Sequence, residues 1–264
     1  MDKKWRLIDS GPCGASLNMS VDEAIADAVR KGSSAPTLRL YQWDRPSISL
    51  GCFQRASDID TVYCDANGIP VVRRPTGGRA ILHDKELTYS FSARTDRGPF
   101  AKGLLDSYRR ISSAFNLAFC KAGIHAEPKT KREKGRVLAG SPLCFQSSSF
   151  GEILAGGKKV VGSAQKRWED GLLQQGSIPY SLNEKDICGA FGLNKAEGLR
   201  ECMTGVKDLV PGLDESEFKD MIKTSFEETF GISLVPCPLS QDEAALALDL
   251  QREKYLQQEW TLRR

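Results

Sequence analysis

The sequence predicts a protein of the α/β or α+β class, in which layers of helix pack on sheet. Short apolar runs and alternating runs, both typical of strands, dominate the middle of the chain, and apolar residues at helical spacing dominate its two ends. Of its 264 residues, 40% are apolar and 27% charged, an ordinary balance for a globular protein. This length suits one large domain, or a large domain with a small appendage.

Strand and helix patterns alternate before residue 70. The first helix is predicted over Ser16–Arg30, because its apolar residues recur on one face and Gly32 follows as a stop. Thr37–Trp43 alternates between apolar and polar positions, which is typical of a strand. The other elements expected here are strands at Trp5–Ile8, Ser47–Leu50 and Ile69–Arg73, and a helix at Ser57–Ala66 capped by Ser57 or Asp58.

The run Val71–Ser92 predicts a strand, a glycine turn and a second strand. Gly77 and Gly78 lack Cβ atoms, so the backbone can bend tightly there, and its N–H groups can hold a phosphate, a carbonyl oxygen or an oxyanion. The turn is surrounded by positive charge from Arg73, Arg74 and Arg79. An ordinary hairpin with solvated arginines explains the same pattern, and spacing alone leaves both interpretations open.

The second half begins with the longest helical pattern, Leu104–Ala122. Residues 152–168 predict a second glycine hairpin with Gly156-Gly157 at its turn, and Leu172–Pro179 follows as a further strand. The elements expected after it are helices at Lys185–Phe191, Asp214–Phe230 and Gln241–Gln257, and a short strand at Gly231–Val235.

Charge and hydropathy limit the classes of function. A formal net charge of +3 is too small to indicate nucleic-acid binding by itself. The N-terminus has no apolar signal core, and no stretch approaches the roughly 18 apolar residues that span a bilayer, so we expect a cytoplasmic protein that does not bind membranes. A basic run over residues 129–136 is either a solvated loop or a docking site for an acidic partner.

Eight cysteines are scattered without a CxxC pair, which argues for reduced thiols and against a disulfide framework or a zinc site. Cys144 is the candidate reactive thiol, because it lies in a polar loop between basic segments. A nearby cation favours the thiolate, the nucleophilic form of cysteine. Lys158 and Lys159 on the following hairpin are candidate partners, although a surface cysteine beside two hairpin lysines also explains the pattern.

Other motifs are weaker. His83, one of two histidines, suits either a general base or a hydrogen-bonded structural residue. No Ser, His and Asp order suggests a triad, and neither GxxxxGK[ST] nor GxGxxG occurs. Gly162, Ser163 and Ala164 offer small residues where a ligand can approach a strand closely, or they form a bulge.

Two runs together resemble the signature of the lipoate/biotin protein ligase and acyltransferase superfamily, from about Trp5 to the C-terminus. The first is RRPTGGRAILHD, with Arg74, Thr76, Gly77, Gly78, Arg79 and His83, and the second is KVVGSAQ, with Lys159, Gly162, Ser163 and Ala164. The resemblance implies the class II synthetase-like fold, a mixed sheet with flanking helices and a ligand tunnel. It also implies one catalytic domain over residues 1–264, with C-terminal helices at about 240–264 packed on it.

Within the superfamily, the chain most resembles the cysteine-dependent octanoyltransferases of Gram-positive type. ATP-dependent lipoate ligases usually have a third glycine where this chain has Arg79, and commonly an accessory C-terminal domain for which few residues follow here. Biotin ligases use a GRGRxGR-like loop that this chain lacks. The HDKELTYS run, Cys144-Phe145, Lys159 and the closing residues 254–264 match the octanoyltransferase branch.

The resemblance implies transfer of octanoate from octanoyl-acyl carrier protein to the lysine of a lipoyl domain, chiefly that of the glycine-cleavage H protein, without a cofactor or metal. Cys144 would be the nucleophile, and Lys159 would favour its thiolate and receive the proton of the incoming amine. The Gly77-Gly78 turn, or Gly162 and Ser163, would hold the oxyanion. Both carriers are acidic in this family, so the basic run at 129–136 would steer them to the site.

Three alternatives stay open at this level. An ATP-dependent lipoate or biotin-type ligase would form an acyl-adenylate and need no cysteine. An amidotransferase that moves octanoyl between lipoyl domains would also use a cysteine. A non-catalytic relative would only bind lipoylated domains, but the presence of both Cys144 and Lys159 weighs against it.

Overall fold

The computed structural model describes residues 3–128, 153–193 and 197–264. Cys144 and the basic run at 129–136 therefore lie outside the described residues. The strands, in chain order, are β1 (Lys4–Cys13), β2 (Thr37–Trp43), β3 (Ser47–Leu50), β4 (Val71–Arg73), β5 (Ile81–His83), β6 (Glu86–Arg94), β7 (Ala126–Pro128), β8 (Ile153–Ala155), β9 (Lys158–Arg167), β10 (Gly171–Pro179) and β11 (Ser233–Pro236).

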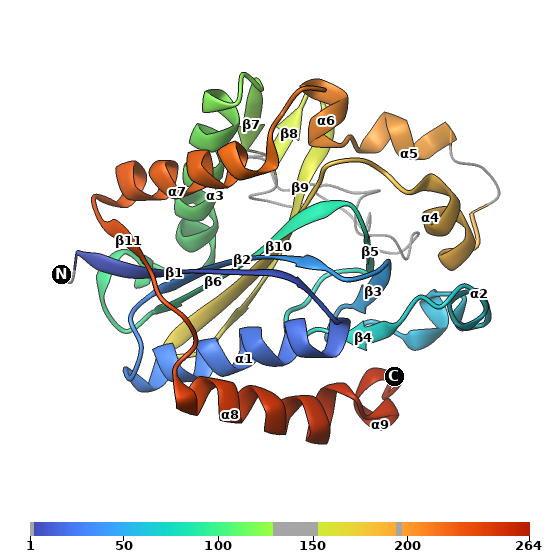
Figure 1. Cartoon of the computed structure of the whole chain (residues 1–264), viewed down its shortest axis with the longest axis horizontal. Coiled ribbons are helices and arrows are strands. Elements are labelled where there is room, and N and C mark those ends of the chain that lie inside the picture. The colour runs from blue at the N-terminus through green and yellow to red at the C-terminus, as the bar shows by residue number, and fades with distance from the viewer. Residues whose placement is uncertain (1–2, 129–152, 194–196) are drawn as a thin grey trace.

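The strands form a large mixed sheet and a small one. The large sheet has the order β11-β1-β2-β6-β10-β9-β8-β7, in which β1 runs parallel to both of its neighbours and the other neighbouring pairs are antiparallel (Figure 1). The small sheet has the order β4-β3-β5, with β4 parallel and β5 antiparallel to β3. The central strand of the small sheet thus joins two strands that do not pair with each other.

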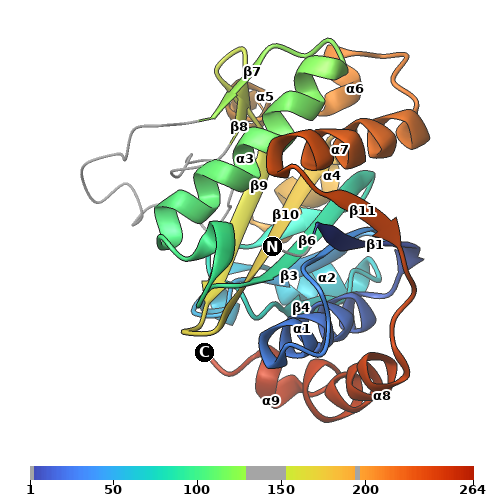
Figure 2. The same ribbon diagram turned by 90° about the vertical axis from the view of Figure 1, so that its left-hand side faces the viewer.

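Helices cover both faces of the large sheet, with α3 and α7 on one face and α1 and α8 on the other (Figure 2). The helices are α1 (Ala15–Lys31), α2 (Thr61–Ala66), α3 (Leu104–Lys121), α4 (Glu184–Ala190), α5 (Glu197–Cys202), α6 (Val206–Leu209), α7 (Glu215–Phe230), α8 (Gln241–Leu250) and α9 (Gln258–Thr261), with a π-helical turn at Gln251–Tyr255 and 3₁₀ turns at Ala56–Asp58 and Gly98–Phe100.

The long helices begin and end at local signals. Gly32 ends α1 in the left-handed conformation with φ of 78°, and Gly231 ends α7 in the same way with φ of 64°. The Asp214 carboxylate accepts the N–H groups of the first turn of α7, and Ser240 forms a capping box with Glu243 at the start of α8. These caps agree with the helix boundaries predicted from the sequence.

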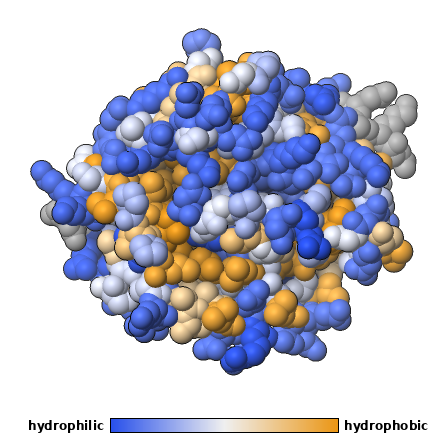
Figure 3. All heavy atoms as spheres, in the orientation of Figure 1, coloured by the Kyte–Doolittle hydropathy of each residue, from blue (hydrophilic) through white to orange (hydrophobic). Residues whose placement is uncertain are grey.

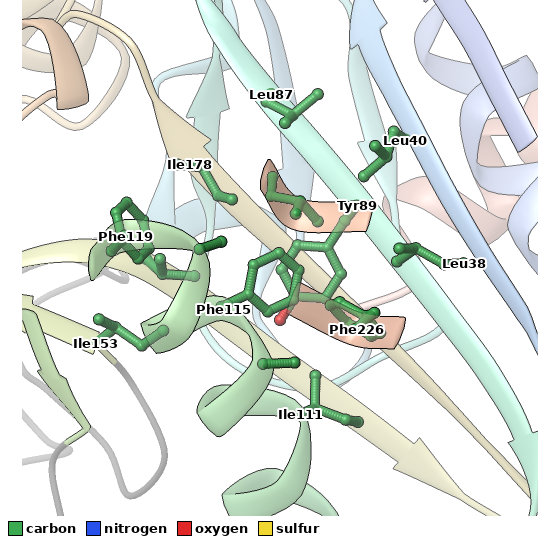
Figure 4. Packing of buried hydrophobic residues seen from close by; sticks show 14 of the residues in the cluster. Leu38, Leu40, Leu87, Tyr89, Ile111, Phe115, Phe119, Ile153, Ile178 and Phe226 are labelled. Carbon is green, nitrogen blue, oxygen red and sulfur yellow. The ribbon is translucent and has the colours of Figure 1, made fainter. Parts of the chain in front are cut away.

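The main hydrophobic core lies between the large sheet and the pair α3 and α7 (Figure 4). Leu38 and Leu40 of β2 point into it, whereas Arg39 and Tyr41 of the same strand face α1, because side chains alternate along a strand. The opposite face of the sheet therefore carries polar groups beneath α1. A separate apolar cluster joins α1 to α8 and includes Ile8, Ala24 and Ala247.

The fold class predicted from the sequence is confirmed, and most predicted elements are present within a few residues. The helix expected at Ser57–Ala66 is wrong in its start, because Asp60 and not Ser57 or Asp58 caps α2. The helix expected at Gln241–Gln257 leaves α-helical geometry after Leu250. The glycine hairpin at 152–168 is present as β8 and β9.

The hairpin interpretation of Val71–Ser92 is wrong. The chain forms β4, the glycine turn and β5, but both strands pair with β3 and not with each other. The second predicted strand is also divided, because β5 lies in the small sheet and β6 in the large one. Hydrophobic periodicity indicates that a segment is extended, but it does not indicate which strand pairs with it.

Two surface properties complete the fold. No helix in the described residues is long and apolar enough to span a membrane. The face that Figure 3 shows carries apolar surface broken up by polar side chains. The large apolar side chains that stay exposed include Phe53, Val62 and Leu248.

Replacing Phe226 by alanine tests the location of the main core. Its ring is fully buried and lies 5.2 Å from the ring of Phe115 and 5.9 Å from that of Phe91. We expect Phe226→Ala to lower the free energy of unfolding by about 3–5 kcal/mol in urea titrations, because it removes buried surface and leaves a cavity. Phe53→Ala is the matched control, since Phe53 is 71% exposed and should change stability by less than about 0.5 kcal/mol.

Candidate active site

The glycine turn is folded around a buried arginine. The Arg74 side chain is 3% exposed, and its Nη2 donates hydrogen bonds to the carbonyl oxygens of Gly77 and Arg79, each at 2.7 Å. Its Nη1 donates to the carbonyl oxygen of Ser49 on β3 at 2.8 Å. The interpretation that solvated arginines surround the turn is therefore wrong for Arg74, which fixes the turn to the small sheet.

The neighbouring Arg73 holds a different part of the chain. It is fully buried, and its Nη1 donates to the carbonyl oxygens of Gly51 and Gln54 at 2.7 and 2.6 Å. Its Nε donates to the carbonyl oxygens of Trp260 and Thr261 at 3.2 and 2.9 Å. The C-terminal residues are thereby attached to the loop that follows β3.

Close backbone contact explains two glycines near the turn. A Cβ atom on Gly51 would lie 1.8 Å from the carbonyl oxygen of Gly78, so only glycine fits there. Gly78 itself has φ of +86°, and a Cβ at this position would lie 3.6 Å from the Cβ of Ala164 on β9. The turn therefore lies against β9, where the second motif runs. Gly77 has open space around it.

A pocket opens among β2, β3, β5, β6, β9, β10 and α1, beside Arg74 at the start of the glycine turn. Of the residues singled out in the sequence, Arg74, His83, Ser163 and Ala164 line it, and Thr76 contacts it through a hydrogen bond to Gln175. Gly162 is next to them on β9, paired with Ser177. Lining residues that sequence reasoning missed are Met19, Tyr41, Trp43, Ser49, Ile81, Thr88, Gln175, Gly176 and Ser177.

His83 is fixed on all sides. Its ring is 4% exposed and stacks on Trp43 with the ring centroids 4.1 Å apart. Nδ1 lies 2.8 Å from Oε1 of Glu86, whose Oε2 accepts a hydrogen bond from the Ser177 hydroxyl. Because the carboxylate is an acceptor, Nδ1 carries the proton, and Nε2 accepts from the Ser49 hydroxyl at 2.8 Å.

Ser49, His83 and Glu86 thus form a hydrogen-bonded chain like that of a catalytic triad, with a hydroxyl, an imidazole and a carboxylate. Ser49 Oγ also accepts a hydrogen bond from Arg74 at 3.0 Å, however, and its side chain is fully buried. A fully buried hydroxyl that is held by both of its neighbours is poorly placed to attack a substrate. The arrangement is best explained as a rigid pocket wall.

Lys159 and Lys158 differ in exposure. The Lys159 side chain is 1% exposed at the start of β9, whereas Lys158 beside it is half-buried. The Lys159 carbonyl accepts the N–H of Thr204 at 3.1 Å, which ties the strand to the segment after α5. A buried lysine four residues before the pocket-lining Ser163 needs a functional or a structural reason, because burying an ammonium is costly.

Cys52 is a described cysteine that contacts the turn. Its N–H donates to the carbonyl oxygen of Thr76 at 2.8 Å, and its Sγ lies 3.0 Å from Nη2 of Arg263. No pattern in the sequence distinguishes Cys52 from the other cysteines. Among the described residues, no group of three His, Cys, Asp or Glu side chains is arranged to hold a metal ion.

The fold and the site define a class of protein: a mixed sheet with a glycine turn, a buried lysine and a ligand pocket, as in catalytic domains that handle lipoate-type acyl groups. The model of the lipoyl protein ligase A/B catalytic domain matches residues 15–227. The chain belongs to this family.

Similar proteins agree with this assignment over the whole chain. An octanoyltransferase LipM from Geobacillus kaustophilus is 35% identical and one from Kyrpidia tusciae 37% identical, over 98% of this chain and at least 98% of theirs. A crystal structure of lipoate-protein ligase A bound with ATP is 26% identical over 99% of both chains, with a TM-score of 0.83. The family, the fold and the octanoyltransferase class predicted from the sequence are confirmed.

Gly51→Ala tests whether the turn must approach β3. The new methyl group would overlap the Gly78 carbonyl and push the turn away from the pocket, so we expect acyl transfer to fall by about 100-fold. Unfolding in urea should show a loss of about 1–3 kcal/mol from the clash. Gly14→Ala is the control, since its Cβ meets the nearest atom at an ordinary 3.6 Å. Wild-type rates in Gly51→Ala would contradict the assigned contact.

Proposed function

We propose that this enzyme transfers octanoyl from octanoyl-acyl carrier protein to the lysine of a lipoyl domain, with the glycine-cleavage H protein as the main acceptor, in the cytoplasm. The acyl group is carried on Cys144 as a thioester. The observation that carries the proposal is the burial of Lys159 at the head of the strand whose Ser163 and Ala164 line the pocket. Relatives named octanoyltransferase over nearly the whole chain support it.

The proposed first step is thioester exchange. The Cys144 thiolate attacks the carbonyl carbon of the donor thioester and a new C–S bond forms. The old C–S bond breaks, and the carrier thiolate leaves and takes a proton from the Lys159 ammonium, which becomes neutral. The Lys159 ammonium stabilises the thiolate, since a cation nearby favours the charged form of a thiol. One thioester replaces another, so this step is nearly thermoneutral and requires no ATP.

The second step transfers the acyl group to an amine. The lipoyl-domain lysine attacks the acyl-enzyme, an amide replaces the thioester, and Cys144 leaves as the thiolate. Lys159, neutral after proton exchange, receives the proton of the incoming amine. Amide formation makes this step favourable, so the two-step reaction proceeds toward the octanoylated lipoyl domain.

The Gly77-Gly78 turn is the better of the two candidate oxyanion sites. In the part of the chain that the structure describes, the N–H groups of Gly77 and Gly78 donate to no other protein atom. Gly162 and Ser163 instead lie in the ladder between β9 and β10. Donors free to meet developing charge are what an oxyanion site requires.

We expect the hydrocarbon chain to lie against the apolar side chains of this pocket. Met19, Tyr41, Trp43 and Ile81 supply apolar surface, and each methylene that is buried contributes roughly 0.8 kcal/mol to binding. A second candidate function, an ATP-dependent lipoate ligase, is favoured by the likeness to the ATP-bound ligase A. The two functions differ in whether acylation needs ATP and a cysteine.

Intact-mass spectrometry distinguishes these functions. The protein is incubated with octanoyl-acyl carrier protein in the absence of ATP, and we expect one octanoyl group to be gained and removed by hydroxylamine. Cys144→Ala should abolish the gain, whereas Cys52→Ser should keep it, although Cys52 contacts the turn. Labelling that survives Cys144→Ala, or transfer from free octanoate only with magnesium-ATP, would contradict the thioester route.

Lys159→Met tests the role of the buried lysine. We expect the rate of acylation to fall by roughly 100-fold or more, because the thiolate loses its cation and the amine its proton acceptor. Lys158→Met is the matched control on the adjacent residue and should stay within about threefold of the native rate. Equal effects of the two substitutions would show that only the net charge of the hairpin matters.

A further inference from the structure

A buried carboxylate outside both motifs gathers four hydrogen bonds beneath the pocket. Asp22 of α1 is fully buried, and its Oδ1 accepts from Nη1 of Arg39 at 2.7 Å and from the Ser90 hydroxyl at 2.6 Å. Its Oδ2 accepts from the Tyr41 hydroxyl at 2.9 Å and from Nε2 of Gln175 at 2.7 Å. Both carboxylate oxygens are therefore committed to fixed donors.

Gln175 connects this carboxylate to the glycine turn. Its Oε1 accepts a hydrogen bond from the Thr76 hydroxyl at 2.8 Å, while its Nε2 donates to Asp22. Because a carboxylate only accepts, the amide has one orientation, with nitrogen toward Asp22 and oxygen toward Thr76. The Gln175 side chain is 6% exposed and lines the pocket.

Tyr41 reinforces this arrangement. Burial, and next the charge of Asp22, raise the pKa of Tyr41 well above its ordinary value. The hydroxyl therefore keeps its proton at neutral pH and remains a donor to Asp22. Oδ2 of Asp22 thus accepts one hydrogen bond from Tyr41 and a second one from Gln175.

The turn is thus held at two places. Arg74 binds the carbonyl oxygens of Gly77 and Arg79 from the side of the small sheet. Gln175 binds Thr76, the residue before Gly77, from the side of the large sheet. Holding Thr76 restrains the residue whose peptide plane carries the Gly77 N–H, and so limits the conformations that the glycine turn can adopt.

We propose that Gln175, oriented by Asp22, is a positioning residue for acyl transfer, which holds Thr76 so that the Gly77 and Gly78 N–H groups point at the acyl carbonyl. The inference rests on the proposed function for the location of the carbonyl, but it does not depend on Cys144 being the nucleophile. Neither Asp22 nor Gln175 touches the reacting atoms in this scheme.

A donor–acceptor exchange tests the proposal. In Asp22→Asn, the new amide nitrogen faces Nε2 of Gln175, and in Gln175→Glu, two carboxylates face each other. Each single variant should reduce the rate of transfer to a lipoyl domain by about 10- to 100-fold. In the double variant Asp22→Asn/Gln175→Glu, an amide donates to a carboxylate again and Thr76 keeps its acceptor. We expect the double variant to return to within about 10-fold of the native rate.

Gln174→Glu is the matched control. Gln174 is the adjacent residue on β10, is equally buried, and contacts Tyr89 and Gln165 on the other face of the sheet. Adding Asp22→Asn to Gln174→Glu should not restore the transfer rate. If the Asp22 and Gln175 double variant shows the product of the two single losses, the pair is not coupled and the proposal is overturned.

Two further readouts separate positioning from other roles. Amide hydrogen exchange of residues 76–80 should be faster in each single variant and return toward native in the double variant, a result independent of which residue carries the acyl group. The rate losses should be the same for butanoyl and octanoyl donors and should appear in kcat. Losses that vanish with the short donor, or unchanged exchange at the turn, would assign Gln175 to binding of the acyl chain and overturn the proposal.

Discussion

A buried guanidinium group is stabilised when its N–H groups meet acceptors, and this constraint shapes the site. Arg73 and Arg74 are consecutive, and both donate to backbone carbonyl oxygens on separate segments, although Nη2 of Arg73 has no partner among the described residues. Arg73 binds carbonyl oxygens of the C-terminal residues and of the loop after β3, and Arg74 binds carbonyl oxygens of the glycine turn. The positive charges that suggested an anion site thus serve to organise the irregular backbone around the pocket.

Much of the fold was predictable because its signals are local. Helix periodicity and the caps at Asp214, Gly231 and Ser240 lie within a few residues of the elements they define. Strand partners are not local. The hairpin interpretation of Val71–Ser92 was wrong because β3, which precedes the run by some twenty residues, inserts between β4 and β5 and supplies the pairing that each would have taken from the other.

The candidate site was predictable only in part. The resemblance of the two motifs led to Arg74, His83, Ser163 and Ala164, which do line one pocket. Asp22 and Gln175 were missed, although a carboxylate on an apolar helix face and two glutamines in an apolar strand are visible signals. Their meaning depends on contacts between residues more than 150 positions apart, which no single-sequence pattern contains. Cys144 lies outside the described residues, so its role stays a prediction.

The proposed function has a hydrocarbon chain bind against the polar face of the large sheet, where polar groups would have to be covered. The groups that line the pocket already satisfy one another: Tyr41 donates to Asp22, Trp43 to Thr88, and Ser177 to Glu86. In the proposed function an entering acyl chain would therefore break no hydrogen bond among them, which keeps the cost of covering polar groups small. The same strands present Leu38, Leu40 and Tyr89 to the opposite core, so packing and chemistry are separated by the alternation of side chains alone. A polar network that is internally complete can thus act as an apolar wall while it keeps the rigidity that positions the turn.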